Sequence, residues 1–114
     1  MKQSDSAPTV RRSAVSMDTD EFRRLAHALV DQLADALAAV PRGPVTHDDK
    51  ASEVRDALGL GRPLPERGED PAGFLAHTTA GLFAHSLFNQ HPRFFGYITA
   101  PPTPIGILGD FIAS

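Results

Sequence analysis

The placement of proline and glycine is the feature that most limits what this sequence can fold into. The 114 residues include 10 Pro and 9 Gly, and most of these stand in three clusters, at 41–44, 59–71 and 92–104. Proline lacks a backbone donor and disfavours helical dihedral angles in the residue before it, so no helix is expected to cross a cluster. The stretches between the clusters predict an all-α fold of three to four helices with Pro/Gly-rich connections.

The first helix is predicted by apolar residues that recur at steps of three and four, which places them on one stripe of a helix. Asp18 and Glu21 have the spacing of a capping box at its start, and Met17 has the position of a hydrophobic staple. The segment 41–44 should end the helix. The stripe consists of Phe22, Leu25, Leu29, Leu33, Leu37 and Val40.

Three further helices are marked by their caps. Ser52 is the expected cap of a short helix that runs to about Leu58 and ends at Gly59 or Gly61. Each of the other two helices is predicted to begin with an Asp or Thr N-cap followed by Pro, because Pro is tolerated at the first helical position. These are a helix from Asp70-Pro71 to near Asn89, and a last helix from Thr103-Pro104 with Ile105, Leu108, Phe111 and Ile112 on one face and Ile107 beside them.

Composition excludes several classes of protein. The net charge of −3 and the lack of a Lys/Arg block argue against binding to nucleic acid, which needs clustered positive charge. No run approaches the roughly 18 apolar residues of a membrane span, and no signal peptide is evident, so a soluble, cytoplasmic protein without a membrane partner is expected. Residues 1–16 lack periodic apolar positions and are predicted to form a disordered tail.

The residues alone predict no catalytic or metal site. Cysteine is absent, which excludes thiolate ligands and nucleophiles. His77 and His85 share one predicted helix, but eight residues separate them by roughly 12 Å of helix rise, too far to hold one ion. One segment, 91–97, is dense in aromatic side chains although it is not expected to form a helix. Aromatic rings in such a segment are expected to line a pocket or to pack at an interface.

That aromatic segment carries a resemblance to a known family. It is followed by Pro104 and by Leu108-Gly109-Asp110, and segments 21–23 and 54–58 fit the same pattern. Together they resemble the N-terminal region of the group II pyridoxal-phosphate-dependent decarboxylases, the family of aromatic-L-amino-acid and tyrosine decarboxylases. The most specific part of the resemblance is the run His91-Pro92-Arg93-Phe94-Phe95-Gly96-Tyr97.

The resemblance implies a full-length α/β enzyme of fold-type I that binds pyridoxal 5'-phosphate, acts on an amino acid and forms a homodimer. Residues 17–90 would form its helical dimerisation arm. Residues 91–114 would provide an active-site-lining loop and the truncated start of the cofactor domain. The implied substrate-binding residues are Tyr97, Ile98, Thr99 and Ala100; the last three depart from the family's aromatic, Pro and hydroxyl pattern, which argues against a catechol-like substrate.

The resemblance also requires a lysine that this sequence does not provide in the expected context. The family holds its cofactor through a Lys that usually follows His, whereas the lysines here are Lys2 and Lys50. We therefore expect a fragment that is not catalytic alone and whose partners include the remainder of its own chain. The alternatives are a stand-alone helical interaction module, which could be a degenerate remnant, and an independent small-ligand or metal binder.

Overall fold

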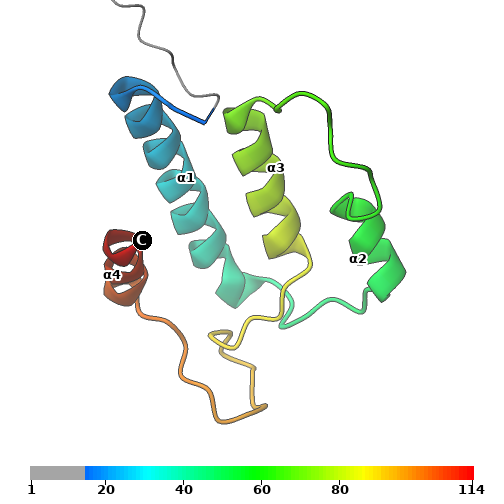
Figure 1. Cartoon of the computed structure of the whole chain (residues 1–114). Helices are drawn as coiled ribbons and strands as arrows, with labels where there is room; N and C mark the ends of the chain where they lie inside the picture. The colour runs from blue at the N-terminus through cyan, green and yellow to red at the C-terminus, as the bar shows by residue number, and fades with distance from the viewer. Residues whose placement is uncertain (1–14) are drawn as a thin grey trace, which may run out of the picture.

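A computed structural model describes residues 15–114 of the chain (Figure 1). Within this range the regular structure is entirely helical, with four α-helices, so the prediction of an all-α chain of three to four helices is confirmed. The predicted tail at 1–16 lies, apart from its last two residues, outside the described residues. The elements are α1 (Thr19–Ala39), η1 (Val40–Arg42, a 3₁₀ turn), α2 (Ala51–Ala57), α3 (Pro71–Ala84) and α4 (Pro104–Ala113).

Helix α1 begins and ends where the sequence predicts. The carboxylate of Asp18 accepts the backbone N–H of Glu21 at 2.8 Å, which satisfies one of the free donors of the first turn. The helix ends at Ala39, and the 3₁₀ turn that follows it contains Pro41, the first residue of the segment 41–44. Leu25 and Val40, both on the predicted stripe, are the most buried apolar side chains of the described residues, each 5% exposed.

The predicted cap of α2 was wrong. The helix begins at Ala51 with Lys50 as its N-cap, and the Glu53 carboxylate accepts the Lys50 N–H at 3.0 Å. Glu53 thus fixes the start by reaching back three residues, and this contact moves the cap from Ser52 to Lys50. The predicted end is confirmed at Gly59, whose φ of 67° is the left-handed conformation that glycine adopts without steric cost.

The starts of α3 and α4 are confirmed. Asp70 accepts the N–H of Gly73 at 2.8 Å, and the Thr103 hydroxyl accepts that of Gly106 at 3.1 Å. The predicted end of α3 near Asn89 was wrong, because the helix stops at Ala84. The backbone beyond it turns to meet the segment that follows η1.

The apolar residues of α4 differ in their exposure. Ile105 and Ile112 are 75% and 86% exposed. The side turned toward α1 carries Ile107, Leu108 and Phe111, which share the one stripe that steps of three and four define.

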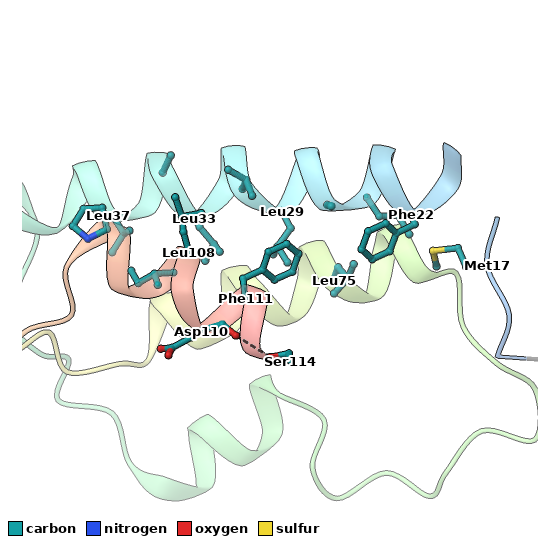
Figure 2. Close-up of a pocket in the computed structure, with 16 residues that line it drawn as sticks. Met17, Phe22, Leu29, Leu33, Leu37, Leu75, Leu108, Asp110, Phe111 and Ser114 are labelled. Carbon is teal, nitrogen blue, oxygen red and sulfur yellow. Dashed lines mark hydrogen bonds between the residues drawn. The ribbon is translucent and has the colours of Figure 1, made fainter. Parts of the chain in front are cut away.

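The helices are arranged as an open layer rather than around a closed core (Figure 1). Helix α1 packs against α3, and α4 lies beside α1, where Leu75 of α3 lines the same apolar groove (Figure 2). Helix α2 approaches α3 closely at Gly81, where an added Cβ would lie 2.8 Å from Leu58 Cδ2. Among the described residues only Leu25, Val40 and His91 are buried. Most apolar side chains of these helices therefore keep one side uncovered.

Candidate functional site

The segment between α3 and α4 carries the predicted site residues, and its first part is fastened to the segment after η1. The backbone N–H of Phe88 donates to the Val45 carbonyl at 3.0 Å. Nδ1 of His85 lies 2.7 Å from a carboxylate oxygen of Asp49. These contacts explain why α3 ends early, since the Phe88 amide bonds outside the helix.

His91 is the most buried residue of this segment, with 3% of its surface exposed. Its Nε2 lies 3.1 Å from the carbonyl oxygen of Gly43, and its Nδ1 lies 3.0 Å from the backbone nitrogen of Arg93. A carbonyl can only accept and a backbone N–H can only donate, so Nε2 carries the proton and Nδ1 is the acceptor. The geometry therefore assigns the neutral Nε2–H tautomer to this ring.

Sequence reasoning gave His91 no separate role. The sequence feature that could have indicated a role is its position before Pro92. A residue before Pro is disfavoured in a helix, so residue 91 is expected in a turn, where its ring can bond to the backbone. The partner, Gly43, stands 48 residues away. Nothing in the local pattern points to it.

Tyr97, the first predicted substrate-binding residue, has an unusual backbone. Its φ of 58° makes it the one non-glycine residue with positive φ in the described part of the chain. Such a conformation costs on the order of 1–3 kcal/mol and persists only where the surroundings enforce it. The ring stacks on Phe94 with centroids 6.3 Å apart, yet 86% of the residue stays exposed.

The other three predicted residues continue this exposed stretch. Thr99 is tied back, because its hydroxyl accepts a hydrogen bond from the Asn89 side-chain amide at 3.3 Å. Ile98 is fully exposed and Ala100 is exposed. The structure thus places all four side chains, including Tyr97, on one surface strip that two contacts hold to the preceding turn.

A separate apolar groove lies between α1 and α4 (Figure 2). The groove has a volume of about 640 Å³. Asp110 and Ser114 supply polar atoms to its lining. The groove offers apolar surface and a single ionisable side chain, so it is suited to packing rather than to chemistry. Its apolar lining includes Leu29, Leu33, Leu37, Leu75, Ile107, Leu108 and Phe111.

The residues that the structure describes do not fit pyridoxal phosphate. That group requires a lysine amine in a protected site, whereas Lys50 is the single lysine of residues 15–114 and is exposed at the start of α2. In the same range no three His, Asp or Glu side chains gather in a way that could hold a metal ion.

None of the helices in residues 15–114 combines the length and the apolar character that crossing a bilayer demands.

Comparison with known proteins gives a consistent result. The chain is 26% identical over 100 residues to an aromatic-L-amino-acid decarboxylase of Bacillus atrophaeus, covering 88% of this chain and 20% of that protein. It is 30% identical over 109 residues to a tyrosine decarboxylase of Oryza sativa subsp. japonica (96% and 20%), and 29% identical over 99 residues to a phenylacetaldehyde synthase of Petunia hybrida (86% and 19%).

The chain thus spans about one fifth of the length of these curated relatives. No protein-family model matches the sequence, and no solved structure matches it.

Proposed function

We propose, on the premise that this chain is related in sequence to the aromatic-L-amino-acid and tyrosine decarboxylases, that it is the N-terminal part of an amino-acid decarboxylase that uses pyridoxal phosphate. The observation that carries the proposal is the extent of the similarity, which covers 88–96% of the chain in the first two relatives. In this proposal the chain supplies structure rather than catalytic groups. The lysine that holds the cofactor would belong to another part of the protein.

The first proposed role is that of residues 17–90 as an arm that packs against the rest of the enzyme and a second subunit. The chain exposes 10,089 Å², whereas a compact protein of 12.2 kDa exposes about 6,100 Å². Even if residues 1–14 contributed the full surface of an unfolded chain, about 2,200 Å², roughly 1,800 Å² of excess surface would remain.

That excess is large on the scale of protein interfaces. A stable interface of standard size buries about 800 Å² on each partner. Part of the uncovered surface within residues 17–90 is apolar, including Phe22 on α1 and Phe74 and Leu82 on α3. These features support an arm that is covered in a larger homodimeric assembly.

The second proposed role is that of residues 97–100 as part of the wall of the substrate pocket. Tyr97 supports this role, because backbone strain in proteins concentrates at functional sites. Its exposed ring and the neighbouring Thr99 hydroxyl would offer apolar contact and a hydrogen bond to an amino-acid substrate.

The test replaces the matching segment of the Bacillus atrophaeus decarboxylase with residues 17–114 of this chain. We expect a dimer that releases carbon dioxide from an amino acid. Tyr97→Ala in the hybrid should lower kcat/KM by at least about tenfold, as the loss of a substrate contact worth about 1.4 kcal/mol would do. Leu64→Ala, a change at a similarly exposed residue of the 59–71 segment, should leave it unchanged.

The stand-alone interaction module remains the competing reading, and the apolar groove between α1 and α4 favours it. Size-exclusion chromatography with light scattering and circular dichroism of the 114-residue chain separate the two. A folded, monodisperse species of the chain alone, together with a hybrid enzyme in which Tyr97→Ala has no effect, would reject the proposed function.

A further inference from the structure

We propose that His91 is a positioning residue, whose neutral imidazole cross-links the segment after η1 to the turn that presents residues 97–100. This role rests on the proposed function, because it presumes that those residues face the substrate. His91 is placed too deep to meet the substrate itself, being 3% exposed. It would act through the backbone groups that its ring joins.

The cross-link has a long-range bond and a local bond. The long-range bond runs from Nε2–H to the Gly43 carbonyl at 3.1 Å. The local bond runs from the Arg93 N–H to Nδ1 at 3.0 Å. Because one ring makes both bonds, the position of the turn at residue 93 is set relative to a segment that stands 48 residues earlier in the chain.

The backbone on both sides of His91 is folded tightly around it. Its N–H donates to the Phe88 carbonyl at 3.1 Å, and its own carbonyl accepts the N–H of Phe94 at 2.9 Å. Phe88 in turn donates its N–H to Val45 at 3.0 Å, two residues after Gly43. The turn therefore meets the 43–45 segment through three bonds, since the Arg93 side chain also donates to the Gly43 carbonyl, at 3.5 Å. Of the three residues that make these bonds, His91 is the buried one.

The predicted substrate-facing residues depend on this turn for their own position. Phe94, whose N–H bonds to the His91 carbonyl, stacks against the ring of Tyr97. Asn89, two residues before His91, donates to the hydroxyl of Thr99 at 3.3 Å. His91 is the one buried polar side chain in the described residues. The Phe94–Tyr97 and Asn89–Thr99 contacts both begin at residues of the turn around it.

Two substitutions separate the two bonds of the ring. In His91→Gln the side-chain amide reaches the place of Nε2 and can donate to Gly43. In His91→Asn the shorter side chain can accept from the Arg93 N–H as an Asx turn, but it does not reach Gly43. His91→Ala removes both bonds, and His77→Asn, at an exposed position of α3, serves as the matched control.

The chain contains its own reporter for the experiment. Tyr97 is the single tyrosine and the sequence has no tryptophan, so the intrinsic fluorescence of the full chain reports on Tyr97 alone. Its anisotropy measures how firmly the ring is held. Amide hydrogen exchange of Phe88 measures the attachment to Val45.

We expect His91→Asn and His91→Ala to lower the anisotropy of Tyr97 and to speed exchange of the Phe88 amide about tenfold, the effect of losing one hydrogen bond. His91→Gln should stay close to the parent, and His77→Asn should not change either signal. In the unmodified chain, two-bond ¹H–¹⁵N spectra at neutral pH should show the Nε2–H tautomer of His91.

The inference is overturned if His91→Ala leaves Tyr97 as firmly held as in the parent. It is also overturned if His91→Asn preserves the signal and His91→Gln loses it, since the local turn would then suffice. An Nδ1–H tautomer contradicts it without any substitution, which keeps the inference testable where a variant fails to fold. Failure of the proposed function has a separate signature: Tyr97 anisotropy follows the expected order while Tyr97→Ala leaves the hybrid enzyme unaffected.

Discussion

Replacing Gly81 with alanine measures the contact between α2 and α3, and Gly109 provides the matched control. Both glycines lie within helices, where alanine is more favourable than glycine by about 1 kcal/mol. An added Cβ at Gly109 would meet nothing within 4 Å, so Gly109→Ala should stabilise α4 by about that amount. At Gly81 the added Cβ would come within 2.8 Å of Leu58 Cδ2.

Leu58 would have to leave its present position, at a cost of about 0.5–1.5 kcal/mol for an off-rotamer side chain. The gain in helix propensity and this cost nearly cancel, so Gly81→Ala should be close to neutral in α3. In a Leu58→Ala background the cost disappears, and Gly81→Ala should then stabilise α3 by about 1 kcal/mol.

The assay is native-state amide hydrogen exchange, which gives the free energy of local opening for α3 and α4 separately. The Leu58→Ala variant is measured first as the new reference. The reasoning is refuted if Gly81→Ala stabilises α3 as much in the parent as in the Leu58→Ala background, because α2 would then not contact Gly81 in solution.

Three further substitutions test the local features of the fold. Asp70→Ala should lower the opening free energy of the first turn of α3 by about 1 kcal/mol, whereas Asp70→Ser should retain most of it, as measured by amide exchange. Gly59→Ala should destabilise the end of α2 by about 1–2 kcal/mol because φ is 67° there, while Gly61→Ala, with open space around it, should not; equal effects would contradict this. Asp49→Asn should lower the free energy of unfolding by less than about 1 kcal/mol, because Asp49 and its partner His85 are both partly exposed. A larger loss in a denaturant titration would contradict this.

The starts of the helices could be predicted because their causes are local. The side chain of Asp18 bonds to a backbone amide three residues ahead, and Asp70 and Thr103 do the same. Such contacts form within one turn, so the residue types and their spacing are sufficient. The cap of α2 was predicted wrongly, at Ser52. The Glu53 carboxylate accepts the Lys50 N–H instead, so the helix begins after Lys50.

The candidate site was only partly accessible to this reasoning. The aromatic run that ends at Tyr97 indicated where the loop lies, and the similarity to the decarboxylases followed from it. The role of residues 97–100 as a pocket wall stays a prediction. The left-handed backbone of Tyr97 and the bond from Asn89 to Thr99 could not be foreseen, because both depend on how the loop folds back on itself.

The sequence by itself determined the all-helical class, the starting caps of α1, α3 and α4 and the irregular connections between the helices. These features are local, because Pro, Gly and capping side chains act over three or four residues. Tertiary structure decided where α3 ends and what His91 does. Their partners, Val45 for Phe88 and Gly43 for His91, lie more than forty residues away. A hydrogen bond over that separation exists only once the chain has brought two distant segments together, and no local pattern encodes it.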